Sequence, residues 1–295
     1  MSAKPALGEP GVTIAEPRSA TPPRSRTVII RAERRWRLPD LSELRLYREL
    51  FWVLALRDVK VRYKQTVLGA AWAVFQPLLT MVVFTQIARV GKFTTDGVRP
   101  EVFYYCGMLP WLLFANSLSS AGNSLVGSQH LISKVYFPRL VLPVASVITA
   151  LIDFAIAFVV LLLLMLLYRV PPAPQIVLLP AFVGLASLAA LAFGLWLCAL
   201  NAQFRDVRHV APFLTQLWLF ATPVLYSSTA VGGGWKHALL VLNPMSAIVE
   251  GVRWCVLGKP APGEGLGACV AILVVVLAGA LLYFDRVQRT LADRL

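Results

Sequence analysis

Long apolar runs, separated by short polar segments, dominate the chain. Charged side chains are absent from five long segments, which lie between Lys64 and Arg89, Glu101 and Lys134, Arg169 and Arg205, Arg208 and Lys236, and Glu264 and Asp285. A sixth stretch, 140–168, holds a single charge, Asp153. Because a membrane-spanning helix needs about 20 mostly apolar residues, the pattern predicts six spans, at about 68–88, 103–126, 140–168, 176–200, 210–227 and 266–284.

The same pattern predicts helices rather than strands as the spanning elements. The apolar–polar alternation of barrel strands is absent from these runs, and a helix satisfies its backbone groups within its own segment. The chain is therefore predicted to be an all-α integral membrane protein. Its expected parts are a disordered cytoplasmic tail over 1–39, an amphipathic interface helix over 40–66, a six-helix transmembrane domain over 67–288 and a cytoplasmic C-terminus over 289–295.

The segment just before the first span is predicted to be a helix that lies in the membrane interface. Asp40, followed three residues later by Glu43, resembles a capping box. Apolar residues then recur at helical spacing, at Leu44, Tyr47, Phe51 and Leu54. The segment is too short and too charged to span, so its apolar face is expected to lie on the cytoplasmic membrane surface. Its role is either simple anchoring or docking of a cytoplasmic partner.

The N-terminal residues show no secretory signal peptide. Residues 1–35 are rich in Pro, Ala and Arg and contain no apolar stretch of the kind that a signal peptide needs. They are expected to form a disordered cytoplasmic tail, with a docking arm as the alternative.

Composition and charge exclude two broad classes of protein. Apolar residues make up 58% of the chain and charged residues 15%, with a mean hydropathy of +0.69, which is unlike an ordinary soluble enzyme. The net charge of +13 also suits a nucleic-acid-binding protein, but the basic residues lie beside the spans rather than on one face. Segments that become cytoplasmic in the six-span arrangement hold 21 of the 28 Lys and Arg residues. The positive-inside rule therefore predicts that both termini are cytoplasmic.

The 228–265 segment, which this arrangement places on the extracytoplasmic side, is predicted to contain a re-entrant helical hairpin. Its apolar run, 238–257, is interrupted by Asn243-Pro244, Glu250 and Arg253, so it does not suit a seventh span. Glu250 and Arg253 stand three residues apart, on one face of a helix, and are expected to pair.

Two residues inside predicted spans are unusual for a membrane helix. Pro77 removes one backbone hydrogen bond and is expected to kink the first span. Asp153 lies near the middle of the third span, where a carboxylate is costly. A proton relay needs an ionisable partner in another span, and the other spans contain no Asp, Glu, Lys or Arg. An interhelical hydrogen bond to Ser, Thr or Asn is therefore expected.

The sequence shows no pattern of a catalytic or metal site. The four cysteines form no CxxC pair, and His130, His209 and His237 are isolated. No G-x-x-x-x-G-K-[ST] loop occurs, so the chain cannot itself be an ATPase. An integral-membrane glycosyl or acyl transferase is the alternative of another class, but it requires clustered His or acidic residues at the membrane face.

Several motifs resemble those of one transporter family. The pattern RD-x-K-x-RY-x-x-x-x-LG-x-x-W, followed by Gln-Pro, is formed here by Arg57, Asp58, Lys60, Arg62, Tyr63, Leu68, Gly69, Trp72, Gln76 and Pro77. Segments 131–143, 201–226 and 242–254 follow in the family's order, with a PV-x-Y turn and an external Asn-Pro. Over about 40–290 the chain is similar to a type-2 ABC exporter permease, of the branch that exports O-antigen, capsular polysaccharide or teichoic acid.

The resemblance implies a transport subunit with no cofactor of its own, because ATP and Mg²⁺ would bind in a separate ATPase subunit. Two copies of the chain and two ATPase subunits would assemble in the bacterial inner (plasma) membrane. They would export a lipid-linked glycan and bind no nucleic acid. A permease of the same superfamily that exports a drug or a lipid is the alternative.

Candidate residues fall into three groups. ATPase docking is expected at the interface helix and two cytoplasmic loops, through Arg57, Asp58, Lys60, Arg62, Lys134, Arg139, Arg205, Asp206 and Arg208. A sugar path is expected along aromatic rings, at Trp72, Phe75, Trp111, Phe114, Trp196, Trp218, Phe220 and Tyr226. Structural roles are expected for Pro77, Asp153, Asn243, Pro244, Glu250 and Arg253. The positive-inside rule alone is the alternative for the cations, and lipid contact or helix packing is the alternative for the rings.

Overall fold

The computed structural model describes residues 47–64, 71–91, 94–135, 137–228 and 234–291. The regular elements in these ranges are helices, and the described residues form no strand. The predicted all-α class is therefore confirmed for this part of the chain. The tail over 1–39, the Asp40–Glu43 helix start and the Leu68-Gly69 part of the first motif lie outside the described residues.

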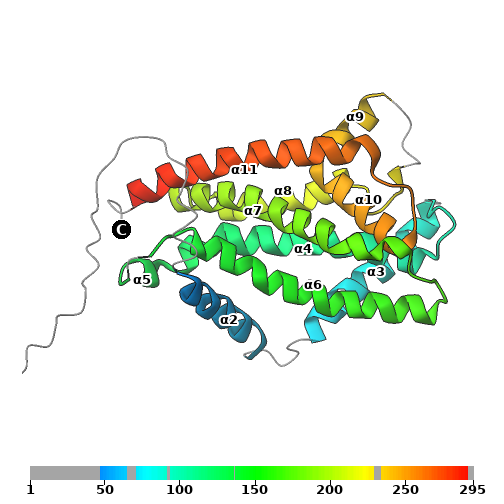
Figure 1. Ribbon diagram of the computed structural model, residues 1–295, viewed down its shortest axis with the longest axis horizontal. Helices are drawn as coiled ribbons and strands as arrows, with labels where there is room; N and C mark the ends of the chain where they lie inside the picture. Colours follow the sequence, from blue (N-terminus) through cyan, green and yellow to red (C-terminus); the bar gives the residue numbers. More distant parts are fainter. Residues whose placement is uncertain (1–46, 65–70, 92–93, 136, 229–233, 292–295) are drawn as a thin grey trace, which may run out of the picture. The chain divides into compact units, whose positions relative to one another are not determined.

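The described residues form eleven helical elements, which Figure 1 shows in sequence order. Their bounds are α2 Arg48–Lys64, α3 Ala71–Gly91, α4 Pro100–Gly127, α5 Gln129–Ile132, α6 Val141–Leu167, η1 Pro174–Leu178, α7 Leu179–Gln203, α8 Val207–Ala221, α9 Trp235–Leu242, α10 Pro244–Leu257 and α11 Gly263–Leu291.

Four of the six predicted spans correspond to helical segments that are long and apolar enough to cross a membrane. These are Ala71–Gly91, Val141–Leu167, Pro174–Gln203 and Gly263–Gln288. The bent pair α9–α10 makes a fifth if its two helices are counted as one span. Predicted spans 103–126 and 210–227 correspond to α4 and α8, which fall outside this set. A multi-pass membrane protein is thus supported, and the count of six is not confirmed in the described residues.

Helix α4 is the centre of the packing rather than a lipid-facing helix. Of its 28 residues, 17 are buried, and it contacts α3, α6, α7, α8 and α10. It lies between α6 and α7 in Figure 1. Polar residues lower its hydropathy, at Asn116, Ser117, Ser119, Ser120, Asn123 and Ser124. A helix enclosed by other helices does not have to present an apolar surface to lipid, which explains its composition.

Helix α8 is shorter than the predicted span because of a proline. It ends at Ala221, and Thr222, the residue before Pro223, is extended with φ −101° and ψ 139°. A proline disfavours helical geometry in the residue before it. None of the 15 residues of α8, all of which are described, is buried. The predicted 210–227 span is therefore a helix followed by an irregular segment, 222–228.

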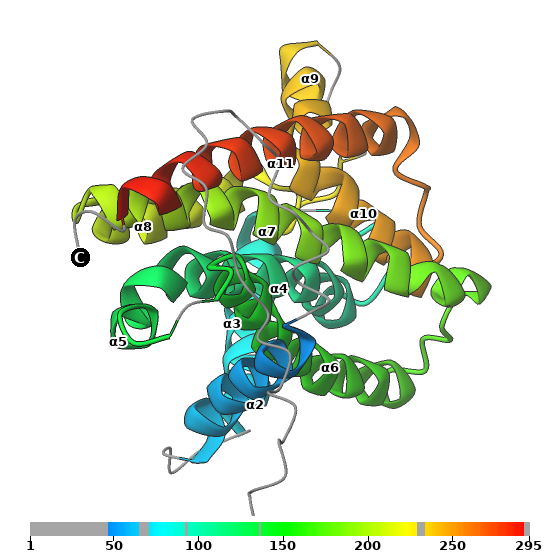
Figure 2. The ribbon, with the colours of Figure 1, turned by 60° about the vertical axis from the view of Figure 1, so that its left-hand side comes forward.

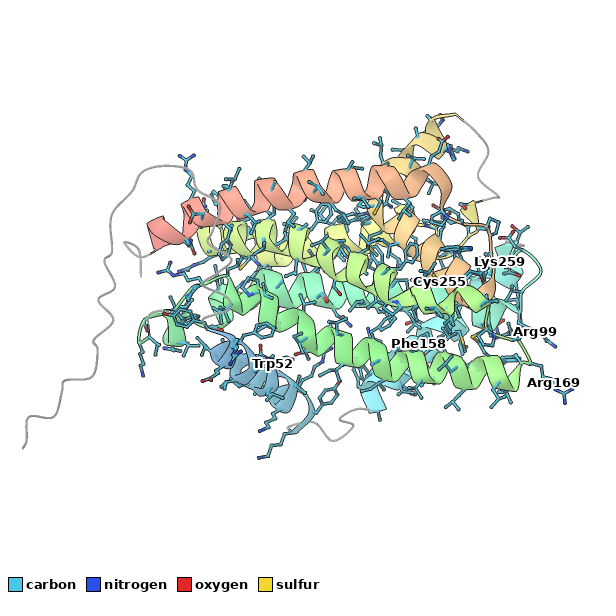
Figure 3. The ribbon with its side chains drawn as sticks, viewed as in Figure 1. Trp52, Arg99, Phe158, Arg169, Cys255 and Lys259 are labelled. Atoms are coloured by element: carbon cyan, nitrogen blue, oxygen red, sulfur yellow. The ribbon has the colours of Figure 1, made fainter. Side chains whose placement is uncertain are left out.

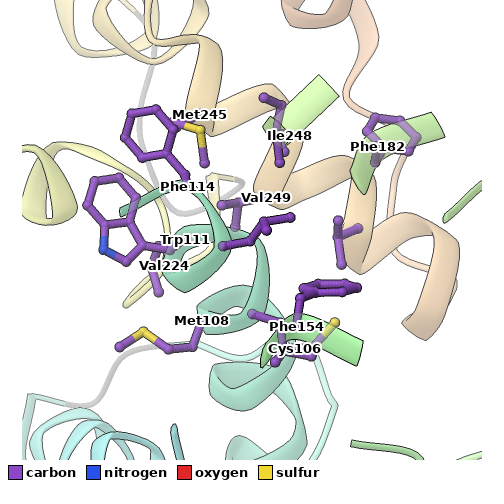
Figure 4. Close-up of a cluster of buried hydrophobic side chains, with 14 of the residues drawn as sticks. Cys106, Met108, Trp111, Phe114, Phe154, Phe182, Val224, Met245, Ile248 and Val249 are labelled. Atoms are coloured by element: carbon purple, nitrogen blue, oxygen red, sulfur yellow. The ribbon is translucent and has the colours of Figure 1, made fainter. Parts of the chain in front are cut away.

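The buried apolar side chains form two clusters. The larger cluster is built mainly from α3, α4, α6, α7, α10 and α11, and part of it is shown in Figure 4, where Trp111, Phe114 and Met245 lie close together. The second cluster joins α2 to the start of α6, the end of α7 and the last turns of α11. Glycine allows the closest approach within the larger cluster, because a Cβ on Gly251 would lie 1.9 Å from the Phe182 ring.

Helix α2 differs from the prediction in where its apolar stripe lies. Leu54 is buried, and Tyr47 and Phe51 pack against the second cluster, so this stripe faces protein rather than the membrane surface. The opposite side also carries exposed apolar residues, including Trp52 and Leu56. The sequence periodicity located a buried face correctly but could not identify what covers it.

The predicted break before the last span is present. Helices α9 and α10 meet at Asn243 and are bent by 81°. Asn243 is extended at its own position and caps α10, whose first residue is Pro244, as expected for a proline at a helix start. The 238–257 apolar run is thus two helices at a sharp angle, which suits either a broken span or a re-entrant segment.

Candidate functional site

An ion pair joins the end of α2 to the middle of α6. The Arg62 guanidinium lies 2.8 Å from Asp153 Oδ2, and the Tyr63 hydroxyl donates a hydrogen bond to Oδ1 of the same carboxylate. Asp153 is 8% exposed. The prediction of a Ser, Thr or Asn partner was therefore wrong: the partners come from α2, which the search for ionisable groups in other spans did not include.

The Tyr63 hydroxyl is a stable donor to the Asp153 carboxylate. Partial burial, and then the hydrogen bond to Asp153, raise the pKa of Tyr63 to about 12. A phenol is protonated at neutral pH in any case, and the shift extends the pH range over which Tyr63 donates to the carboxylate. Tyr63 belongs to the RY pair of the first motif, but it was not predicted as a site residue, since nothing in the sequence indicates that it reaches residue 153.

A cavity of about 450 Å³ opens beside this ion pair. Its walls come from four helices: the end of α2, the first two turns of α3, the middle of α4 and the middle of α6. The polar part of the lining is Arg62, Tyr63, Gln76, Asn116 and Asp153, and the rest is apolar apart from the indole N–H of Trp72. A largely apolar cavity with a few converging polar groups is the usual form of a ligand site.

A second cavity, of about 270 Å³, lies between α2, α4 and α6 and shares Arg62 with the first. Its lining is rich in hydroxyl groups, from Ser120, Ser124, Ser128, Ser146 and Thr149. Asp58 also lines it. Among the described residues no group of three or more His, Cys, Asp or Glu side chains could hold a metal ion.

The predicted aromatic path residues divide into buried and exposed sets. Trp111 and Phe114 are 4% and 0% exposed, and Phe114 packs edge-on against Trp218 with ring centroids 5.1 Å apart. Trp196 stacks on Tyr283 of α11 at 4.9 Å. For these residues the structure favours helix packing over a sugar-facing role. Tyr226 is half-buried, whereas Trp72, Phe75 and Phe220 are at least half exposed.

Asn243 joins α8 to the α9–α10 break through all of its side-chain hydrogen-bonding groups. Its Oδ1 accepts from Met245 N and from the Trp218 indole at 3.1 and 3.0 Å. Its Nδ2 donates to Ala221 O and Thr222 Oγ1 at 3.2 and 3.0 Å. An asparagine with two donors and an acceptor is fully satisfied by this set. The arrangement supports the structural role expected for Asn243.

Arg253 does not pair with Glu250 as expected. Its guanidinium is buried and donates to the carbonyl oxygens of Pro223, Val224 and Tyr226. It also lies over the Phe103 ring, 3.8 Å from the centroid. Glu250 instead accepts a hydrogen bond from Ser228 and interacts with Arg253 only through space. The helical spacing of the two charges was correct, but the irregular segment after α8 offers the guanidinium closer acceptors.

The predicted docking residues of the two loops gather at one end of the described helices. Lys134, Arg205, Asp206 and Arg208 are exposed, and Figures 1 and 2 place α5 and the end of α7 on the same side as the end of α11. Arg139 is half-buried and donates to Gln288 O of α11. Arg99, Arg169 and Lys259 lie at the opposite end in Figure 3.

The docking residues of α2 have mixed environments. Lys60 is exposed, and Arg57 pairs with its neighbour Asp58 at 2.8 Å. Arg62 instead pairs with Asp153 across the helix interface. The structure thus gives Arg62 a partner within the chain that the docking hypothesis did not include.

Comparison with known proteins finds one family and several named relatives. The family described as ABC-2 type transporter matches residues 49–257. The chain is 32% identical over 255 residues, 86% of this chain and 98% of the relative, to "O-antigen export system permease protein RfbA" of Myxococcus xanthus. A protein of the same name from Klebsiella pneumoniae is 26% identical over 68% of this chain and 77% of its own length. "Polysialic acid transport protein KpsM" of Escherichia coli is 25% identical over 81% of this chain and 94% of its own length.

Proposed function

Because the chain belongs to the ABC-2 type transporter family, we propose that it is the permease subunit of an ABC exporter that moves a lipid-linked polysaccharide across the bacterial inner membrane. The observation that carries this proposal is similarity over nearly the whole length of an O-antigen export permease. The polysialic acid transport protein supports the same substrate class, with a capsular glycan in place of O-antigen. The chain is a transport subunit rather than an enzyme.

ATP hydrolysis takes place in a partner subunit, which binds ATP and Mg²⁺. The sequence lacks a phosphate-binding loop of the G-x-x-x-x-G-K-[ST] type, so the energy must come from outside the chain. The exposed charges of the 133–139 and 204–208 segments lie at one end of the molecule, beside the last turns of α11. This end is the proposed ATPase-docking surface, and the outward face of α2 extends it.

A second copy of the chain pairs with the first along α3 and α8. Both helices expose a row of large apolar side chains, which on α8 includes Phe213, Leu217 and Phe220. None of the fully described residues of α8 is buried within one copy, although the helix also contains Pro212 and polar side chains. Pairing along this surface places Trp72, Phe75 and Phe220 beside the path between the copies. Aromatic rings there offer flat surfaces on which sugars slide.

The proposed topology has six crossings and cytoplasmic termini. Helix α4 crosses within the bundle, where its polar face is covered by other helices, and α8 crosses at the contact with the second copy. Single cysteines at Lys134 and at Arg169, in chains whose native cysteines are replaced, test this arrangement in intact cells. A membrane-impermeant thiol reagent should label the Arg169 position and not the Lys134 position; the reverse pattern would contradict it.

Deletion of the gene that encodes the chain tests the proposed function. Cells that lack it should accumulate lipid-linked glycan on the cytoplasmic side and lose the glycan from the surface, and an ATPase should co-purify with the tagged chain. Surface glycan at the normal level, or purification of a transport-competent chain without an ATPase, would contradict the proposal. A chain carrying Arg169→Gln, far from the proposed contacts, should restore export and serves as the matched control.

A further inference from the structure

Helix α2 is attached to α6 at two places. Near its middle, Leu54 and Ala55 are buried in the same cluster as Val141 and Ala145 of α6. Near its end, Arg62 and Tyr63 contact Asp153. At 1.5 Å per residue, Leu54 and Arg62 are about 12 Å apart along α2, and Ala145 and Asp153 are about 12 Å apart along α6. Because α2 and α6 are held together at two places that are equally far apart along both helices, the angle between the helices is fixed as well as their distance.

The contact at Asp153 is costly to break. Asp153 is 8% exposed, and a buried charge that loses its partner strongly destabilises a protein. Tyr63, like any phenol, is protonated at neutral pH, and its raised pKa of about 12, caused by burial and by the hydrogen bond, keeps it a donor in more alkaline solution as well. A movement of α2 alone would leave the carboxylate unpaired, so a movement of α2 together with α6 is favoured.

Helix α3 lies across an open space from this contact. The 450 Å³ cavity separates Arg62, Tyr63 and Asp153 from Trp72, Gln76 and Pro77 of α3. Close-packed helices move as units, whereas a cavity gives room for displacement. At the cavity, the α2–α6 contact and α3 are therefore able to change their separation, while α3 and α6 still pack against each other elsewhere along their lengths.

We propose that Arg62, Tyr63 and Asp153 are positioning residues that clamp α2 to α6, so that the ATPase moves both helices together and changes the width of the cavity against α3. The clamp rests on the proposed function, because that function supplies the ATPase as the source of motion. In this proposal, α6 carries the motion into the membrane, although no docking residue was predicted within α6 itself.

The first test measures distances between helices in the assembled complex. Spin labels are placed on exposed positions Val53 of α2, Val159 of α6 and Val83 of α3, and labelled chains are diluted with unlabelled ones. The native cysteines are all buried and are replaced. Between nucleotide-free and ATP-trapped complexes, the Val53–Val159 distance should change by less than about 2 Å, the size of a small helix adjustment. The Val53–Val83 distance should change by more. Equal changes in both distances, or no change in either, would overturn the clamp.

The second test separates coupling from assembly. Arg62→Gln alone leaves the buried carboxylate with the Tyr63 hydroxyl but without its cation, and should lower the yield of complex. Arg62→Gln with Asp153→Asn removes both charges and should restore the yield, yet export about tenfold less glycan per ATP hydrolysed. Arg62→Lys keeps the charge and should recover most of the coupling. Arg89→Gln is the matched control, because Arg89 also pairs between helices, with Glu101 at 2.9 Å, but at an exposed site away from the clamp.

The outcomes distinguish the clamp from the function on which it rests. Glycan exported per ATP is insensitive to the amount of folded complex, so a merely structural role would lower the yield and leave this ratio unchanged. A double variant with the wild-type ratio would overturn the clamp alone. A wild-type complex that neither binds an ATPase nor exports glycan would overturn the proposed function as well.

Discussion

Two buried charges, Asp153 and Arg253, are stabilised in different ways. Asp153 pairs with a cation that α2 brings from outside the predicted spans. Arg253 has carbonyl oxygens around its guanidinium and an aromatic ring beneath it. In each case the partner lies far away in the sequence, in a segment without regular spacing to the charge. The need for a partner followed from the chemistry, but its identity required the fold.

Gly107 makes the Arg253 site possible. A Cβ on Gly107 would lie 2.4 Å from the Arg253 guanidinium, closer than atoms approach. Gly107→Ala should therefore displace the guanidinium from its carbonyl partners and destabilise the protein by about 1–3 kcal/mol, as overpacking does. The thermal unfolding temperature of the purified chain in detergent measures the effect.

Gly127→Ala is the control for this substitution. Nothing lies within 4 Å of a Cβ at Gly127, in the same helix, so the unfolding temperature should stay close to that of the wild type. If both variants unfold at the same temperature as the wild type, the close contact at Gly107 is not required for the Arg253 site.

At the scale of helices, the sequence predicted where helices occur better than it predicted what each helix packs against. Runs with no charge, or with Asp153 alone, located α3, α6 and α7 to within three residues at each end. They also located α11, although this helix continues seven residues beyond the predicted end at 284. The 103–126 prediction likewise found a helix, α4, but not its central position. The 210–227 prediction ran past Pro223, whose effect on Thr222 ends α8 early. Which side of a helix faces protein depends on its neighbours, and this explains why Trp111 and Phe114 were predicted for the path and are buried.

The exposed rings of α3 and α8 are the remaining candidates for the sugar path. Trp72→Ala or Phe220→Ala should slow glycan export by about 2–10-fold, since an aromatic contact contributes roughly 0.5–1.5 kcal/mol. Assembly with the ATPase should remain normal, because both rings are at least half exposed. The measurement is the rate at which new glycan appears on the cell surface, normalised to the amount of complex.

Trp235→Ala is the matched control for the two path variants. Trp235 is 70% exposed but lies on α9, away from α3 and α8. Its replacement should leave the export rate unchanged. An equal slowing in all three variants would indicate a general effect of losing an exposed tryptophan or phenylalanine, and normal export in both path variants would remove these rings from the path.

At the scale of the whole chain, exposed charged residues lie at both ends of the described helices, and only one end is proposed to bind the ATPase. Arg205 and Arg208 lie at the end proposed to contact the ATPase, and both are exposed. Reversal of both charges, in Arg205→Glu with Arg208→Glu, should weaken ATPase binding about tenfold, because like charges that face each other across an interface cost free energy. The defect should grow smaller at high salt, where surface charges are screened. Co-purification at two salt concentrations measures it.

Arg169→Glu provides the comparison at the other end of the molecule. This residue is exposed as well, so its reversal changes the net charge of the chain in the same direction without touching the proposed docking surface. ATPase binding should be unchanged. Equal binding by the Arg205–Arg208 variant and the wild type would mean that the loops only set the orientation in the membrane.

ATP-driven movement of glycan through this chain is the central claim, and inverted membrane vesicles test it most directly. Vesicles containing the chain and its ATPase should transfer externally added lipid-linked glycan to their lumen when ATP is present, and should stop when a non-hydrolysable analogue replaces it. Vesicles with the ATPase alone should transfer none. Equal transfer with and without the chain, or transfer that does not need ATP hydrolysis, would contradict the account.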